Sequence, residues 1–226
     1  AWGKLAGVPG TPPDIFRELL AAIRPLAGRP ATAEHREQFQ KYLDVFLRWN
    51  RVHRMTALGS PAEIVRGLFL DSLLFFSVLP PRPLRVVDIG AGSGVPGLPL
   101  RLVDPGISLT LIEAKRKRVS FLLAACRELS LPDVSVVEGR AEDLMAADSA
   151  LAGGFDAVVA RAVGSEKRLF PISLRYLRPG GAVVLAGSPA STGQGGMQVV
   201  KVSVPGGRST RVFLRAAKES SVPRGT

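Results

Sequence analysis

Cysteine and histidine are almost absent from this chain of 226 residues, which contains one cysteine, Cys126, and two histidines, His35 and His53. A single cysteine excludes an intramolecular disulfide. We expect Cys126, in the apolar run FLLAACREL, to be a small buried hydrophobic residue rather than a nucleophile. Because no cluster of cysteine and histidine occurs, a zinc site or another histidine-based metal site is not expected, and we predict an activity without a metal.

Long hydrophobic runs are also missing. No segment approaches the roughly 18 apolar residues of a membrane span, and the N-terminal AWGKLAGVPGTPP lacks the apolar core of a signal peptide. Hydrophobic residues nevertheless make up 46% of the chain, which is ample for a packed core. The sequence therefore predicts a folded, soluble cytoplasmic protein without membrane contact, and we expect it to be a monomer.

Negative charge is scarce relative to positive charge. The chain has 30 lysines and arginines against 19 aspartates and glutamates, a formal net charge of +11. Net charge bears on partners rather than on fold, and polyanions such as nucleic acids are the natural partners of a basic protein. Alternatively, the excess of positive charge reflects a GC-rich genome, which favours arginine codons throughout. The basic residues gather at KRKR (115–118) and near the C-terminus, at Arg208, Arg211, Arg215, Lys218 and Arg224.

The first 80 residues have the apolar spacing of helices. Thr11-Pro12-Pro13 is a helix-start signal, and apolar residues recur at helical spacing over 15–23. Thr32 can cap a second helix, whose aromatic stripe we expect to be core rather than a ligand site. Ser60-Pro61-Ala62-Glu63 has the form of a capping box for a third helix. The sequence predicts an N-terminal helical extension over residues 1–80.

The pattern changes after the proline-rich LPPRPL at residues 79–84. Short apolar runs then alternate with helical segments; the runs are LRVVDIG, ISLTLIEA, VSVVEGRA, FDAVVARAV and GGAVVLAG. This alternation predicts right-handed crossovers and a mostly parallel sheet. The C-terminal MQVVKVSVPGGRSTRVFLRAA has two alternating strands around a Pro-Gly-Gly turn, which predicts an antiparallel hairpin. We therefore predict a Rossmann-like α/β domain over residues 81–226.

The segment VVDIGAGSGVPGLPL contains a glycine fingerprint that fits two classes of cofactor. Gly92, Gly94 and Gly97 form G-x-G-x-x-G, which is typical of dinucleotide sites. Read from Asp88 and Gly90, the same stretch forms D-x-G-x-G-x-G, which is typical of a different adenosine-bearing cofactor. Such glycines let the backbone turn tightly and approach a ligand beyond the carboxyl ends of the strands. The glycines alone leave both cofactors open.

Acidic residues at the ends of three successive predicted strands favour the second pattern. A carboxylate at Asp88 would repel a pyrophosphate but attract the ammonium of an amino-acid tail. Glu113 can accept both ribose hydroxyls of either cofactor, and Glu142 with the backbone of Ala141 can hold the amino edge of adenine. Singly, each acid can instead satisfy loop amides, cap a helix or remain solvated. Jointly they favour S-adenosylmethionine.

Several motifs resemble those of one known family. VVDIGAGSGVPGLPL, LIEAKRKRVSFL, GRAED and VVARAV, with the upstream RWNRVHRMT and LFLDSL, are similar to the small-subunit (16S) rRNA guanine-N7 methyltransferases, also called glucose-inhibited division protein B. The resemblance covers about residues 40–190, and V-P-G-L-P-L is its most specific part. It implies a class I methyltransferase sheet with an N-terminal helical extension. It also implies S-adenosylmethionine as donor, S-adenosylhomocysteine as product, and a guanine in small-subunit ribosomal RNA or an assembly intermediate as acceptor.

The resemblance also implies a donor site. Gly90 and Val95 would line the methionine end, Glu113 would hold the ribose, and Ala141 with Glu142 would hold the adenine. The complete set of expected cofactor-binding residues is Asp88, Gly90, Ala91, Gly92, Gly94, Val95, Glu113, Ala141, Glu142 and Arg161.

On the acceptor side, Arg140 and Arg161 match family arginines that are expected to face the target nucleotide, and Arg161 would lie at the mouth of the pocket. They are the catalytic candidates. The chain departs from the family pattern at three positions: Ala186 replaces a lysine, Arg54 an asparagine and Leu68 a histidine. The missing lysine bears on how the acceptor is held and not on donor binding.

The expected chemistry fits the scarcity of acid–base residues. N7 of guanine has a free lone pair and no proton, so its methylation needs no general base, and catalysis would come from alignment and exclusion of water. Two alternatives remain open at this point. A NAD-dependent oxidoreductase is supported by G-x-G-x-x-G but opposed by Asp88, the hairpin and the lack of a hydride-transfer pair. An RNA-binding module with a vestigial donor pocket is suggested by Ala186.

Overall fold

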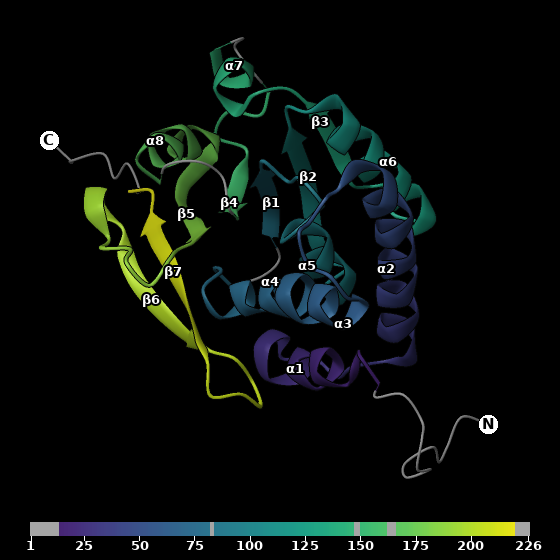
Figure 1. Cartoon of the computed structure of the whole chain (residues 1–226). Coiled ribbons are helices and arrows are strands. Elements are labelled where there is room, and N and C mark those ends of the chain that lie inside the picture. Colours follow the sequence, from purple (N-terminus) through teal and green to yellow (C-terminus); the bar gives the residue numbers. More distant parts are fainter. Residues whose placement is uncertain (1–13, 82–83, 147–149, 162–165, 220–226) are drawn as a thin grey trace, which may run out of the picture.

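A seven-stranded sheet lies at the centre of the part of the chain that the computed structural model describes, namely residues 14–81, 84–146, 150–161 and 166–219 (Figure 1). The strand order is β3-β2-β1-β4-β5-β7-β6. The first five strands are parallel, and β7 pairs antiparallel with β5 and with β6. The strands are β1 (Leu84–Ile89), β2 (Ile107–Glu113), β3 (Ser135–Glu138), β4 (Phe155–Ala160), β5 (Leu177–Ala186), β6 (Gln198–Ser203) and β7 (Thr210–Ala217). The predicted mostly parallel sheet with a C-terminal hairpin is confirmed.

Helices cover both faces of the sheet because successive strand residues point to opposite sides. Val86 and Val159 belong to one hydrophobic core, while their chain neighbours Val87 and Val158 belong to the other. The first core includes side chains of α5 (Gly97–Val103) and α6 (Arg116–Glu128), and the second includes those of α7 (Ala141–Ala146) and α8 (Glu166–Tyr176). Cys126 of α6 is buried, as expected, and burial raises its pKa to about 11, which makes it a poor nucleophile at neutral pH.

The N-terminal extension consists of helices, as predicted. Thr32 and Ser60 form capping boxes with His35 and Glu63, while the start signal at 11–13 lies outside the described residues. The capping box at Ser60 begins a helical stretch that passes from α-helix to π-helix, back to α-helix and then to 3₁₀-helix. The elements are α1 (Arg17–Ala27), α2 (Ala33–His53), α3 (Pro61–Ile64), the π-helix η1 (Val65–Leu70), α4 (Asp71–Leu73) and the 3₁₀-helix η2 (Leu74–Ser77).

The extension packs on the α5 and α6 side of the sheet, as an outer layer (Figure 1). Phe46 of α2 meets Phe121 of α6 edge-on at 5.9 Å between ring centroids, and Tyr42 stacks on Phe69 of η1 at 4.5 Å. Phe46, Tyr42 and Phe69 have no exposed surface, which confirms that the aromatic stripe is core. The extension and the sheet share one continuous hydrophobic core, and the expected domain boundary at residue 80 stays a prediction. Among the described residues, no helix is long and apolar enough to cross a membrane.

Candidate active site

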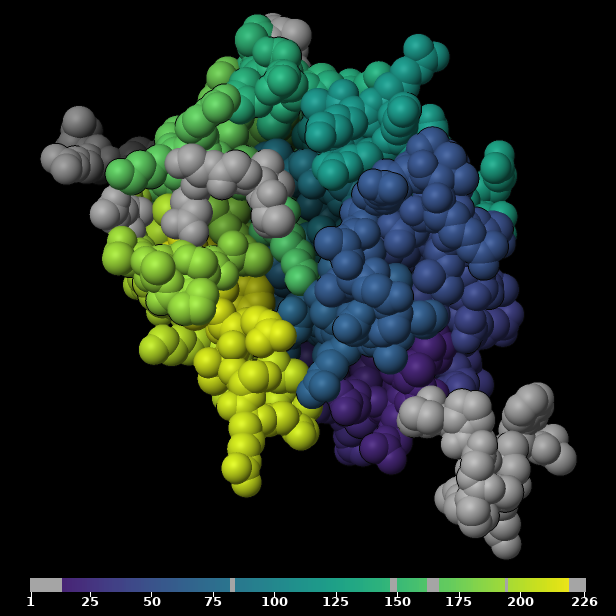
Figure 2. All heavy atoms as spheres, viewed as in Figure 1, coloured from purple at the N-terminus to yellow at the C-terminus, as the bar shows by residue number. Residues whose placement is uncertain are grey.

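A cavity of about 490 Å³ opens at the carboxyl ends of the central parallel strands. This edge is where open α/β sheets bind their ligands, because the loops there present backbone groups to a common crevice. Figure 2 shows the blue helices of the extension and the green region of α8 on either side of a recessed teal surface. The lining consists of Met55, Leu68, Ile89, Gly90, Ala91, Gly92, Ser93, Val95, Ile112, Glu113, Ala114, Arg118, Gly139, Arg140, Ala141, Glu142, Arg161, Arg168 and Leu169.

Most of the expected site residues meet at this cavity. From the predicted set, the lining contains Gly90, Ala91, Gly92, Val95, Glu113, Arg140, Ala141, Glu142 and Arg161. They come from the loops after four different strands, so the fold brings together positions far apart in the sequence. Asp88 and Gly94 are not among the residues that line the cavity. Their direct contact with a cofactor stays a prediction.

The glycine loop follows β1 and is shaped by two close approaches. Gly94 has a φ of +82°, and a Cβ there would lie 2.5 Å from Cδ1 of Leu98, so the loop requires glycine. At Gly97, the first residue of α5, a Cβ would lie 2.8 Å from Cδ2 of Leu111 in β2. Gly97 therefore allows α5 to pack closely on the sheet, and the glycines of this loop that line the cavity are Gly90 and Gly92.

Asp88 is a completely buried carboxyl beneath this loop. Its Oδ2 accepts a hydrogen bond from the backbone N–H of Gly97 at 2.8 Å, and its Oδ1 has no hydrogen-bond partner among the described residues. Burial raises the pKa of Asp88 to about 7, and the nearby charge of Glu113 adds to the effect. The unpaired oxygen is itself buried and Asp88 does not line the cavity, so the expected attraction of an ammonium group by Asp88 stays a prediction.

Glu113 ends β2 and connects the cavity wall to the loops on both sides. Its Oε2 accepts a hydrogen bond from the N–H of Gly92 at 3.0 Å, and its Oε1 accepts one from the N–H of Lys115 at 2.8 Å. The guanidinium of Arg118 lies 3.7 Å from Oε2. Since each carboxylate oxygen has two lone pairs, Glu113 can still accept two hydroxyl hydrogens. These remaining acceptor positions fit the 2′- and 3′-hydroxyls of a ribose.

The loop after β3 forms the opposite end of this wall. Ala141 and Glu142 open α7, and the carboxylate of Glu142 lies 3.7 Å from the guanidinium of Arg168 in α8. The hydroxyl of Tyr176 donates a hydrogen bond of 2.9 Å to the carbonyl of Ala141. Backbone amide and carboxylate groups at such a point can recognise the ring nitrogen and amino group of adenine.

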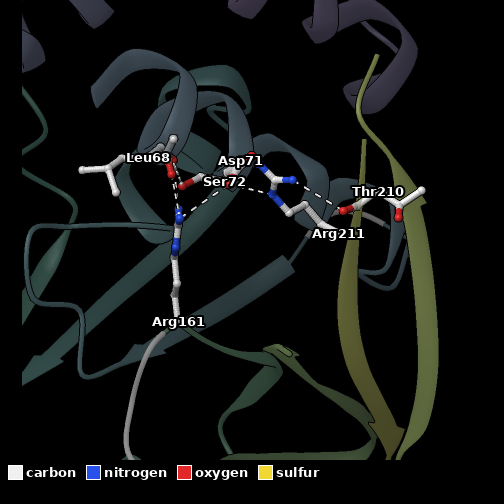
Figure 3. A network of polar contacts seen from close by, with 7 residues as sticks. Leu68, Asp71, Ser72, Arg161, Thr210 and Arg211 are labelled. Carbon is white, nitrogen blue, oxygen red and sulfur yellow. Dashed lines mark hydrogen bonds and ion pairs between the residues drawn. The ribbon is translucent and has the colours of Figure 1, made fainter. Parts of the chain in front are cut away.

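Arg161 follows β4 and forms the far wall with residues of the extension (Figure 3). Its guanidinium donates hydrogen bonds to the carbonyls of Gly67 at 2.6 Å and Leu68 at 3.4 Å, both in the π-helix η1. It also lies 3.6 Å from Oδ2 of Asp71, and the same oxygen accepts a hydrogen bond of 3.0 Å from Arg211 in β7. Burial lowers the pKa of Arg161, the charge of Asp71 opposes that shift and Arg211 adds to it. The network joins three segments of the chain.

Some lining residues were not found from the sequence. Met55 and Leu68 come from the extension, and Leu68 was noted only as a departure from the family pattern. Arg168 of α8 also belongs to the lining. Arg118 belongs to the basic KRKR segment, where nothing in the spacing distinguishes it from its neighbours. The hydrogen bonds of Arg161 to Leu68 and Gly67 join residues that are 93 and 94 positions apart in the chain, and no local sequence pattern predicts such contacts.

The strand order, the antiparallel β7 and the cavity beyond β1, β2 and β3 are those of the class I methyltransferase fold. A putative caffeoyl-CoA O-methyltransferase from Staphylococcus aureus has this fold, with a TM-score of 0.52 and 13% identity over 77% of this chain and 92% of its own. Within the class, the family model for rRNA small subunit methyltransferase G matches residues 35–192, and the chain belongs to this family.

Two relatives carry the same description. Ribosomal RNA small subunit methyltransferase G of Sorangium cellulosum is 41% identical over 179 residues, which cover 78% of this chain and 72% of the relative. The protein of that name from Streptococcus pyogenes serotype M12 is 34% identical over 176 residues, covering 77% and 72%. The protein is therefore an S-adenosylmethionine-dependent methyltransferase. Neither NAD-dependent oxidoreduction nor a vestigial donor pocket is supported.

Proposed function

We propose that this protein transfers a methyl group from S-adenosylmethionine to N7 of a guanine in small-subunit ribosomal RNA or in an assembly intermediate of the subunit. The observation that carries the proposal is the composition of the cavity, whose lining combines the glycine loop, Glu113 and the start of α7 with Met55, Leu68 and Arg161. We assign the first group to one end of the cavity, the donor end, and the second group to the other, the acceptor end. The family relationship and the basic character of the chain agree with an RNA acceptor.

The donor would be held by the first end. Gly90 and Val95 would flank its methionine part, Glu113 would accept the ribose hydroxyls, and Ala141 with Glu142 would contact the adenine. When bound, S-adenosylmethionine supplies a methyl group on a sulfonium, from which the carbon–sulfur bond breaks with its electron pair left on sulfur as the new carbon–nitrogen bond forms. The chain orients the donor and shields it from water.

The acceptor would enter against the second end. Met55 and Leu68 offer apolar surface for one face of a purine, and the cationic group of Arg161 can donate hydrogen bonds to O6 or to phosphate oxygens. Arg140 directly precedes α7 at the first end, so its contact with the target nucleotide stays a prediction. In the cavity of the described chain, the acidic residues are Glu113 and Glu142, and both are engaged by neighbouring groups. N7 has no proton to remove, so an alignment site without a free base supports this atom as the acceptor.

A labelled-methyl assay tests the proposal. The chain is incubated with S-adenosylmethionine carrying a tritiated methyl group and with small subunits from a strain that lacks this modification, and the labelled nucleoside is identified by mass spectrometry. We expect 7-methylguanosine at one position, and much less label with Arg161→Ala, through poorer placement of donor and acceptor. Label on another base or another atom contradicts the guanine-N7 assignment, and binding of S-adenosylmethionine without any transfer contradicts the enzymatic proposal.

A further inference from the structure

Tyrosine is rare in this chain, and both tyrosines lie beneath the cavity. The sequence contains ten phenylalanines but only Tyr42 and Tyr176 as tyrosines. Each has no exposed surface, and each donates its hydroxyl hydrogen to a backbone carbonyl of a residue that lines the cavity. Burying a phenol oxygen costs free energy unless a partner is present, so a phenylalanine would be sufficient if only packing were needed.

Tyr42 reaches the glycine loop from the N-terminal extension. Its ring stacks on Phe69 in the hydrophobic core, and its hydroxyl donates to the carbonyl of Ser93. The next amide, the N–H of Gly94, donates to the carbonyl of Ala91 at 2.7 Å. The peptide plane between Ser93 and Gly94 is thus held at its oxygen by a distant helix and at its nitrogen by the loop itself.

Tyr176 does the same for the loop after β3, from the other face of the sheet. It is the last residue of α8, its ring packs near Phe155, and its hydroxyl donates to the carbonyl of Ala141 at 2.9 Å. This bond fixes the peptide plane that carries the N–H of Glu142. Burial raises the pKa of Tyr176 to about 12 and that of Tyr42 well above its ordinary value, so both phenols remain protonated donors.

We propose that Tyr42 and Tyr176 are positioning residues for the two ends of the methyl donor. Tyr42 sets the loop at the methionine end, and Tyr176 sets the loop at the adenine end, each through one hydrogen bond to a backbone carbonyl. This inference rests on the proposed function, because the donor orientation in the cavity is part of that proposal. It also gives the N-terminal extension a role in donor binding, through a side chain that does not itself reach the cavity.

Two ligands that share the adenosine but differ at the other end separate the two roles. S-adenosylhomocysteine carries the amino-acid tail, and 5′-methylthioadenosine lacks it. Their dissociation constants are measured by calorimetric titration for the full chain, Tyr42→Phe and Tyr176→Phe. We expect Tyr176→Phe to weaken both ligands by the same factor, about three- to tenfold, which corresponds to one lost hydrogen bond. Tyr42→Phe should weaken S-adenosylhomocysteine by a similar factor and change 5′-methylthioadenosine by less than about twofold.

Each tyrosine variant is the matched control of the other, because both lose a buried hydroxyl and keep the ring. Ser120→Ala, which removes a hydroxyl–carbonyl bond of α6 away from the cavity, should leave both constants unchanged. A folded Tyr42→Phe variant that weakens both ligands equally would overturn the role of Tyr42 at the methionine end, and a folded variant of either tyrosine that weakens neither ligand would overturn its positioning role. A wild-type chain that binds methylthioadenosine and S-adenosylhomocysteine equally well contradicts the methionine-end assignment. A wild-type chain that binds neither ligand contradicts the proposed function as well.

Discussion

The two ends of the cavity differ in the groups that form them. The donor end is formed mainly by backbone and acidic side chains at the ends of β1, β2 and β3, and hydrogen bonds between neighbouring loops hold it, such as that from the N–H of Gly92 to Glu113. The acceptor end depends on long side chains from distant segments, with Arg161, Asp71 and Arg211 meeting across the extension, β4 and β7. Backbone groups fixed by the sheet suit a ligand of constant shape, such as the methyl donor. A network of side chains can instead be altered by substitution without changing the sheet. The predictions below test this division.

We expect the largest effect from Gly94→Ala, which adds one methyl group to the donor end. The φ of +82° is unfavourable for alanine, and the new Cβ would lie 2.5 Å from Leu98 and 2.7 Å from the hydroxyl of Tyr42. Strain and overlap together should lower the free energy of unfolding by about 2–4 kcal/mol. Chemical denaturation measures this change. Gly206→Ala is the matched control, because its φ is +73° with nothing within 4 Å of the added atom, and it should cost only about 1 kcal/mol. Equal costs at the two positions would show that the loop is not tightly packed.

Glu113→Gln should have the next largest effect, on donor affinity. The N–H groups of Gly92 and Lys115 donate to different oxygens of Glu113, and in a glutamine one of these oxygens becomes an NH2, which can accept neither a backbone N–H nor a ribose hydroxyl. We expect the dissociation constant of S-adenosylhomocysteine to rise about 10- to 100-fold, as for loss of hydrogen bonds to a charged group. Glu138→Gln, at the exposed end of β3, is the control and should bind normally. Similar losses in both variants would indicate a general effect of charge.

The same division explains what the sequence could predict. The donor end was predictable because its residues sit at strand ends in short motifs, and the alternation of strands and helices places those ends along one edge. Glu113 and Glu142 could therefore be assigned before any contact was known. The strand order, the π-helix at 65–70 and the position of Asp71 had no such signal, because they depend on packing between segments far apart in the chain. Tyr42 illustrates the limit: helical spacing indicated a core residue, and its hydroxyl bond to Ser93 could not be inferred.

Asp71→Asn should affect turnover while leaving donor affinity nearly unchanged. The carboxylate of Asp71 is the charge partner of Arg161, which is largely buried, with 23% of its side chain exposed. Without that charge the guanidinium keeps its hydrogen bonds to the carbonyls of Gly67 and Leu68 but loses the only carboxylate described beside it, so its position should be held less firmly. We expect kcat to fall about tenfold, or about 1.4 kcal/mol, while the dissociation constant of S-adenosylhomocysteine stays within about twofold.

Asp133→Asn provides the control for this change. Asp133 also pairs with an arginine, Arg101, at 2.8 Å, but it lies outside the cavity lining. Its replacement should alter neither turnover nor affinity. If Asp71→Asn reduced donor affinity as strongly as turnover, the two ends of the cavity would act as one cooperative unit. That result would contradict the division into a donor end and an acceptor end.

The smallest effect is expected for Arg211→Gln, which removes the second cation at the same carboxylate. Arg211 is 44% exposed, and ion pairs of this kind contribute about 0–1 kcal/mol. Without Arg211, Arg161 is the remaining described cation beside Asp71, and the charge repulsion by which Arg211 lowers the pKa of Arg161 is removed. Turnover should therefore change by less than about twofold. The double variant Asp71→Asn/Arg211→Gln should be no slower than Asp71→Asn, because both substitutions act on one shared contact. Turnover of Arg211→Gln as low as that of Asp71→Asn would mean that the C-terminal hairpin, through Arg211, orients the acceptor end as directly as the extension does.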